Sequence, residues 1–302
     1  MIAGAGLETG GAGVAAALAA ALCWTLASLL WRRLPTSLGA AQLNLLKNAL
    51  GLVLLLPVLL QAGSAPPTAG WAFLVASGVL GIAAGDSLFF AALRRLGTRR
   101  TLTVEAAAPA LTTLAALAWL GEWPGGSQLL GLGLVTAAVV LVAQRGAARG
   151  GPSLPVREQR LGLLLALLAM VCASAGALLT RHAFVEQTMD PWQAAGIRLG
   201  AATLVQLPLA PGLLAAVWAP LGPRPARRRW PLVLAATLLG TALGIGLQQS
   251  ALARLPAGGA VTLMATAPTM AVLLAPLERD RPGLSGLLAA VLALLGAWLV
   301  VR

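Results

Sequence analysis

Charged residues are scarce in this sequence of 302 residues. Asp, Glu, Lys and Arg together make up 10% of the chain, whereas roughly a quarter of an average soluble domain is charged. Apolar residues make up 59%, and the mean hydropathy is +0.87. This composition excludes an ordinary soluble fold and predicts a protein that is embedded in a lipid bilayer.

Metal ligands and groups for acid–base catalysis are equally few. The chain has one histidine and two cysteines, Cys23 and Cys172, and both thiols lie in apolar stretches where cysteine behaves as a small hydrophobe. The nine acidic residues form no DxxD or ExxE pair inside an apolar stretch. We therefore expect no catalytic residues, no metal site and no cofactor. A membrane-embedded enzyme that processes lipids is the weaker alternative.

Ten apolar runs are long enough to cross a membrane, which takes about 20 mostly apolar residues per helix. They lie at residues 12–31, 38–60, 70–92, 101–120, 126–143, 161–181, 191–210, 230–252, 258–277 and 283–301. The runs are rich in Ala and Leu and lack the alternating ten-residue pattern of a membrane β-strand. The expected fold is therefore an all-α integral membrane protein with ten transmembrane helices.

The basic residues indicate how the chain is inserted. The formal charge is +12, but the basic residues fall in small groups at span ends, so a nucleic-acid partner is not expected. Sixteen of the 21 basic residues lie on odd-numbered loops and three on the opposite side. Because Lys and Arg on short loops stay in the cytoplasm, we expect cytoplasmic odd-numbered loops and both termini outside. The first apolar run is followed by Arg32 and Arg33 and is expected to be a retained helix.

The chain is an internal duplication. A shift of 159 residues aligns Trp71–Pro109 with Trp230–Pro268 without a gap, and 15 of the 39 positions are identical. The neighbouring spans align with a slightly different shift, which places Lys47 opposite Arg198. The informative identities are Trp71/Trp230, Gly81/Gly240, Gly85/Gly244, Arg95/Arg254, Thr103/Thr262 and Pro109/Pro268.

Two five-helix repeats follow from this alignment. We predict a first repeat at residues 1–144, a linker at 145–160 and a second repeat at 161–302. Because five is odd, the second repeat must enter the membrane upside down relative to the first. Inverted repeats are typical of secondary transporters, which bind substrate near the midplane between the halves.

The turns LGEWPG (120–125) and LERDRPG (277–283), each after a proline-bearing helix and before a Gly-containing last helix, complete a family resemblance. The chain resembles the EamA-type permeases of the drug/metabolite transporter superfamily. The resemblance implies efflux of small metabolites, such as amino acids or related compounds or drugs, across the inner (plasma) membrane. Transport is expected to proceed by alternating access with protons or another coupling ion. It leaves a monomer or a homodimer open, and a channel or structural membrane subunit is another alternative. Glu122 and Glu278 are expected to be solvated turn residues.

One polar helix face is expected to carry the substrate site. Asn44, Lys47, Asn48 and Gly51 share a face at spacings of three and four in a span that is otherwise leucine-rich. A cation near the bilayer centre is costly and normally faces the bundle interior. Lys47 and the equivalent Arg198 are expected to approach one central cavity and to bind an anionic group of the substrate. The alternative for each is a structural ion pair or a position near a helix end.

Two acidic residues inside spans are candidates for ion coupling. Burial and a neighbouring cation act in opposite directions on the protonation of a carboxyl, so Asp86 or Glu105 can exchange a proton during transport. Glu105 lies four residues before Pro109, and a proline permits a bend in a spanning helix. Pro109 and Pro268 are therefore candidate hinges. The alternative is an ion pair with Lys47 or a position at the wet end of the helix.

Small residues, amides and one tryptophan complete the candidate site. The motifs GIAAG and GTALG place Gly81, Gly85, Gly240 and Gly244 where two helices can approach closely, either for rocking motion or for simple packing. Further candidates for the cavity wall or substrate contact are Gln248, Gln249 and Trp24.

Overall fold

The computed structural model describes residues 2–32, 38–61, 70–145, 155–218, 226–274 and 284–302. Within these ranges nine helical stretches are long and apolar enough to cross a membrane, and a shorter apolar stretch covers Ala257–Leu273. The same ranges contain no β-strand. The prediction of an all-α membrane protein with ten spans is therefore confirmed.

The first repeat contains spans 1 to 5. Span 3 consists of α3, the π-helical η2 and the first part of α4, and it ends at Gly97, where a φ of 73° interrupts the helix. Span 4 consists of the rest of α4 and α5. The elements are α1 (Ile2–Arg32), α2 (Ala40–Gln61), α3 (Trp71–Ser77), η2 (Gly78–Asp86), α4 (Ser87–Glu105), α5 (Ala108–Leu120) and α6 (Gly126–Arg145).

The second repeat contains spans 6 to 10. Span 7 joins α8, η4 and the start of α9, span 8 joins α10, the π-helical η5 and α11, and span 9 joins α12 and α13. The elements are α7 (Val156–Glu186), α8 (Pro191–Gln206), η4 (Leu207–Leu209), α9 (Ala210–Trp218), α10 (Ala226–Thr237), η5 (Leu238–Leu243), α11 (Gly244–Arg254), α12 (Ala257–Met264), α13 (Ala267–Leu273) and α14 (Leu284–Val301).

Span 3 packs against α7, the first helix of the other repeat. Gly81 and Gly85 lie at this contact, where a Cβ on Gly81 would be 3.3 Å from the Cα of Gly176. A Cβ on Gly85 would be 3.5 Å from the Cβ of Cys172. The first GxxxG motif therefore brings the backbones of the two repeats close together.

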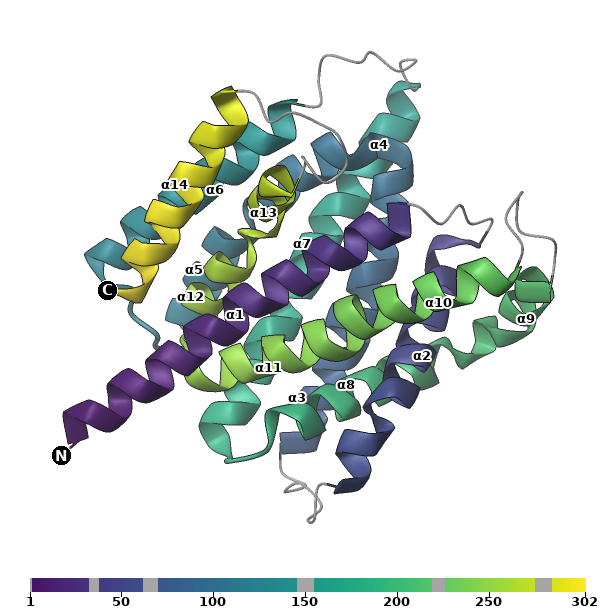
Figure 1. Ribbon diagram of the computed structural model, residues 1–302, viewed down its shortest axis with the longest axis horizontal. Coiled ribbons are helices and arrows are strands. Elements are labelled where there is room, and N and C mark those ends of the chain that lie inside the picture. Colours follow the sequence, from purple (N-terminus) through teal and green to yellow (C-terminus); the bar gives the residue numbers. More distant parts are fainter. Residues whose placement is uncertain (1, 33–37, 62–69, 146–154, 219–225, 275–283) are drawn as a thin grey trace.

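Span 8 makes the equivalent contact with α1, which runs alongside α10 and α11 in Figure 1. A Cβ on Gly240 would lie 2.8 Å from the Cβ of Ala27, and one on Gly244 would meet the indole ring of Trp24. In each repeat, the GxxxG motif of the third span thus faces the first span of the other repeat.

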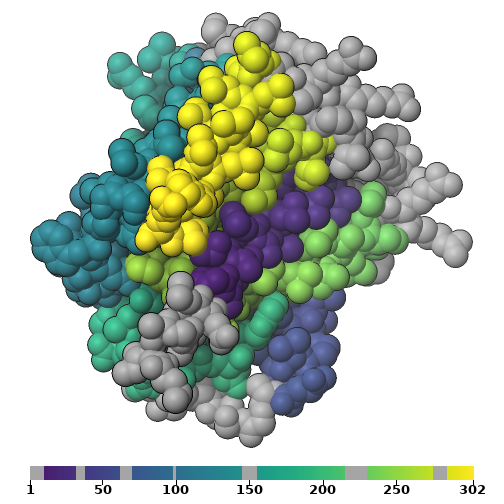
Figure 2. Space-filling model, turned by 60° about the vertical axis from the view of Figure 1, so that its left-hand side comes forward, coloured from purple at the N-terminus to yellow at the C-terminus, as the bar shows by residue number. Residues whose placement is uncertain are grey.

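The last spans of the two repeats, α6 and α14, form a pair at the periphery. A Cβ on Gly131 of α6 would lie 2.5 Å from the carbonyl oxygen of Gly296 on α14, so the two backbones touch. The opposite side of α14 is apolar and exposed, with Leu288 at 51% and Leu294 at 65%. Figure 2 shows α14, in yellow, on the outer surface, as expected for a helix that faces lipid.

Both third spans contain a π-helical segment. η2 and η5 lie at equivalent positions of the duplication, although η2 is longer. The wider turn of a π-helix disturbs the regular backbone pairing and leaves carbonyl groups for other donors. These segments position much of the polar site.

Both repeats also contain a helix break before the predicted hinge proline. The turn at 106–107 separates α4 from α5, and the turn at 265–266 separates α12 from α13. Pro109 and Pro268 are the second residues of α5 and α13. Because proline has no N–H to donate, it suits the first turn of the helix that follows each break.

Candidate functional site

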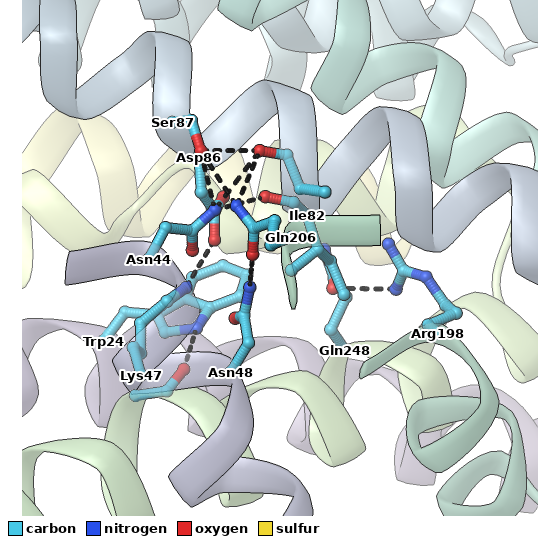
Figure 3. Close-up of polar contacts among 12 residues, drawn as sticks. Trp24, Asn44, Lys47, Asn48, Ile82, Asp86, Ser87, Arg198, Gln206 and Gln248 are labelled. Carbon is cyan, nitrogen blue, oxygen red and sulfur yellow. Dashed lines mark hydrogen bonds and ion pairs between the residues drawn. The ribbon is translucent and has the colours of Figure 1, made fainter. Parts of the chain in front are cut away.

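The polar side of α2 packs against η2. The Asn44 side chain is fully buried and donates from Nδ2 to the carbonyl oxygen of Ile82 at 2.8 Å. The same nitrogen lies 3.1 Å from the Ser87 hydroxyl oxygen, and that hydroxyl donates to the carbonyl oxygen of Ala83 at 2.6 Å. Figure 3 shows these groups converging. Two carbonyl oxygens of η2, those of Ile82 and Ala83, thus accept hydrogen bonds from side chains of α2 and α4.

Lys47, one turn along the same side of α2, forms an ion pair with Asp86 at the end of η2. The Lys47 side chain is 12% exposed, whereas the Asp86 side chain is 37% exposed. The Lys47 ammonium also lies 5.8 Å from the centre of the Phe90 ring, within the range of a cation–π contact. The pair is therefore partly accessible on the side of the Asp86 carboxylate.

Gln206, at the end of α8, links this cluster to the second repeat. Its Oε1 accepts a hydrogen bond from Asn48 Nδ2 at 3.0 Å. Its Nε2 lies 3.2 Å from the Ser87 hydroxyl oxygen and 3.3 Å from the carbonyl oxygen of Ala83. Gln206 and Ser87 were not predicted from the sequence. The signal that could have identified Gln206 is an amide side chain within a span of leucines and valines.

Three buried amide oxygens near the site have no donor among the described residues. They are Oδ1 of Asn44, Oδ1 of Asn48 and Oε1 of Gln249. Buried acceptors are rarely left unpaired, because desolvation without a hydrogen bond is costly. These oxygens can accept hydrogen bonds from water or from the ammonium or hydroxyl groups of a small molecule.

Arg198 lies apart from Lys47. Its side chain is 3% exposed and donates from Nη1 to Gln248 Oε1 at 3.3 Å, and Gln249 Nε2 donates to the same oxygen at 3.3 Å. The Arg198 Nε is buried without a partner in the described part of the chain. In Figure 3 Lys47 and Arg198 stand on opposite sides of the amide groups. Lys47 and Arg198 form no hydrogen bond with each other, and their expected approach to one central cavity stays a prediction.

Glu105 is the last residue of α4 and precedes the break before α5. It is partly buried and has no hydrogen bond or ion pair with any residue that the structure describes. Its carboxyl therefore has no fixed partner there, in contrast to Asp86. The alternative of a Lys47 ion pair applies to Asp86 and not to Glu105.

Trp24 belongs to the contact between repeats. The indole Nε1 donates to the carbonyl oxygen of Gly240 at 3.0 Å, and the ring fills the space beside Gly244. This carbonyl oxygen belongs to η5. A backbone carbonyl of the second π-helical segment thus also accepts a hydrogen bond from a side chain of the other repeat. The observed role of Trp24 is packing and hydrogen bonding at the α1–η5 contact.

A second ion pair corrects the expectation that Glu122 is a solvated turn residue. Its Oε1 accepts a hydrogen bond from Arg181 Nε at 2.6 Å, and the two side chains are only 14% and 18% exposed. Glu122 Oε2 also accepts from the backbone N–H of Ala257, at the start of α12. Arg181 donates to the carbonyl oxygens of Leu252 and Ala253, at the end of α11. The pair thus joins the two repeats at the side of the even-numbered loops, and Glu278 lies outside the described residues.

Each repeat of the chain is similar to one known protein family. A model of the EamA-like transporter family matches residues 11–144 and 160–302, once over each repeat. No curated protein matches the chain significantly. A solved structure, described only as "Crystal structure of protein", has a TM-score of 0.75 and 18% identity, and the alignment covers 95% of both chains. That likeness shows the shared fold, and the chain belongs to the EamA-like transporter family.

Proposed function

We propose that the protein is a secondary transporter that exports small metabolites across the inner membrane in exchange for protons. The fold and family support a membrane transporter of the drug/metabolite superfamily. The observation that carries the proposal is the Lys47–Asp86 ion pair inside the membrane-spanning bundle. A charged group at the centre of a spanning helix costs roughly 2.5 to 3.5 kcal/mol on insertion scales, so such residues are usually functional.

Proton coupling follows from the chemistry of this pair. Protonation of Asp86 removes its negative charge and releases Lys47, whereas deprotonation restores the attraction. The 37% exposure of Asp86 supports access of a proton or substrate to its carboxylate. Glu105, which has no partner among the described residues, is the second coupling candidate.

The groups around the Lys47–Asp86 pair favour a substrate that carries both hydrogen-bond donors and an anionic group. The unpaired oxygens of Asn44, Asn48 and Gln249 can accept hydrogen bonds from an ammonium or hydroxyl group. Lys47 and Arg198 can bind a carboxylate once they exchange their present partners. Amino acids and related compounds combine these features.

Alternating access requires a contact that closes one side of the bundle. In this proposal the Glu122–Arg181 pair is that contact. It connects α7 and the α5–α6 turn with the α11–α12 turn. A Thr113→Cys probe tests this role, because Thr113 and Glu122 line the same small pocket. In a background without Cys23 and Cys172, Arg181→Gln should speed labelling by a thiol reagent. Arg254→Gln, whose arginine bonds only within α11, should not.

The substrate is found first, by screening expressing cells for resistance to amino acids, nucleosides and toxic cations. Purified protein in liposomes then tests coupling with that substrate. Asp86→Asn and Glu105→Gln should separate the steps, because uphill transport driven by a pH gradient is lost while exchange persists. If both variants still concentrate substrate, neither carboxyl is the coupling group.

For orientation, we propose cytoplasmic odd-numbered loops, since 16 basic residues lie on that side and three on the other. A cysteine placed near Arg227, in the loop after span 7, should react with an impermeant reagent only after the membrane is opened. Efficient labelling of intact cells would show the opposite insertion.

A further inference from the structure

A groove of about 420 Å³ lies between α4, α6 and α7, away from the polar site. Leu96, Val104 and Leu163 form apolar parts of its wall. Arg100 and Arg160 also line it, and both of these side chains are exposed. The groove therefore combines a hydrocarbon surface with two cationic groups.

The position of the groove is that of a membrane–water boundary. Its lining residues come from 96–104, around the break between spans 3 and 4, from Gln144 near the end of α6, and from the first turns of α7. These segments are the ends of spans 3 and 5 and the starts of spans 4 and 6, on the side of the odd-numbered loops. Phospholipid headgroups lie at this depth.

The groove is positively charged, and its two arginines use few of their N–H groups in hydrogen bonds to described residues. Arg100 donates from Nη1 to Gln159 Oε1 at 2.9 Å, which leaves its other N–H groups available. Arg160 has no hydrogen bond or ion pair with any residue that the structure describes. The nearby carboxylate of Glu158 is paired with Arg95 at 3.3 Å. Among the described residues that line the groove, none is acidic.

We propose that this groove binds an anionic phospholipid. Its phosphate interacts with the guanidinium groups of Arg100 and Arg160, and an acyl chain lies along Leu96, Val104 and Leu163. Guanidinium groups are suited to phosphate oxygens, and basic pockets between helices favour anionic headgroups. The apolar wall favours a lipid over a soluble phosphate compound, because a soluble headgroup would leave this wall in contact with water.

Photo-crosslinking tests the proposal on the full chain in phosphatidylcholine vesicles that contain phosphatidylglycerol with a photoreactive acyl chain. Crosslinks should map to peptides covering 96–104 and 156–163. Arg100→Gln and Arg160→Gln should each reduce this crosslinking about fivefold, which corresponds to about 1 kcal/mol for a cation beside an anionic lipid. Leu163→Trp, which fills the groove without changing its charge, should reduce it as well.

Arg157→Gln is the matched control, because Arg157 is exposed on the same helix and does not line the groove. It should leave crosslinking unchanged, and all variants are compared as monodisperse protein. The proposal is overturned if Arg157→Gln and Arg160→Gln have equal effects, or if photoreactive phosphatidylcholine labels the groove equally well. Displacement by soluble glycerol phosphate would also overturn it, since the site would then recognise the phosphate without the lipid.

Discussion

Lys47 and Arg198 are equivalent positions of the duplication, but their surroundings differ. Lys47 pairs with the carboxylate of Asp86, whereas Arg198 bonds to the neutral amide of Gln248. The residue equivalent to Asp86 in the second repeat is Ile245, which is 5% exposed. The two repeats thus share a fold, but of these two equivalent cations in the described chain Lys47 alone is paired with a carboxylate.

The same difference extends to the neighbouring positions. In the alignment of the repeats, Glu105 corresponds to Met264, and Asn48 corresponds to Leu199. Among the described spans, the carboxyl groups away from span ends therefore lie in the first repeat, because Glu158 and Glu186 lie at the two ends of span 6. We infer that the first repeat supplies the switchable charge, and that the second supplies a fixed one.

The largest effect is expected at Gly78, which faces the backbone of Arg198. The equivalent residue of the second repeat is Thr237. A Cβ on Gly78 would lie 2.3 Å from the carbonyl oxygen of Arg198 and 2.8 Å from its Cα, and backbone atoms cannot move aside cheaply. Gly78→Ala should therefore abolish the monodisperse peak in gel filtration. Gly133→Ala, with nothing within 4 Å, should fold at least as well as the parent, and a normal Gly78→Ala peak would refute this contact.

Replacement of Lys47 should have the next largest effect. Lys47→Met leaves Asp86 without its cation, so most transport is lost. We expect the free energy of unfolding to fall by about 1 to 2 kcal/mol, less than a full insertion penalty because Asp86 is 37% exposed. Thermal unfolding in detergent and uptake into liposomes measure the two effects. Addition of Asp86→Leu should restore stability but not transport, and wild-type flux in Lys47→Met would remove the pair from the mechanism.

Trp24 tests the contact between repeats, because its equivalent in the second repeat is Ala173. Trp24→Phe removes the donor to the Gly240 carbonyl oxygen and should cost about 1 kcal/mol of stability. The KM for substrate should stay the same if the ring only packs. A higher KM would instead place Trp24 against the substrate. Trp71→Phe, at a ring that is 40% exposed, is the control.

The smallest change in stability is expected for Arg198→Met. Among the described residues this buried cation hydrogen-bonds only to the Gln248 amide, so an apolar side chain of similar length should keep stability within about 1 kcal/mol or raise it. Transport should fall if Arg198 binds the anionic group of the substrate. Destabilisation as large as that of Lys47→Met would reveal a counter-ion for Arg198 and remove the contrast between the repeats.

Hydropathy and the internal alignment were sufficient to predict the ten spans, because each spanning helix must present apolar side chains to lipid along its length. The spacing of Asn44, Lys47 and Asn48 was sufficient to place them on one side of α2. Their partners were harder to predict, since they include Gln206 and backbone carbonyls of η2. A carbonyl has no sequence signal of its own.

The sequence by itself determined the membrane class, the ten spans and the duplication, because these depend on local hydropathy and on identities between aligned residues. Only the tertiary structure decided that Asp86 pairs with Lys47, that Arg198 meets Gln248, and that Glu122 is buried against Arg181. Each of these contacts joins residues from different helices. Their geometry depends on how the helices pack and on where the π-helical turns shift the backbone, and neither is encoded in the residues of one span.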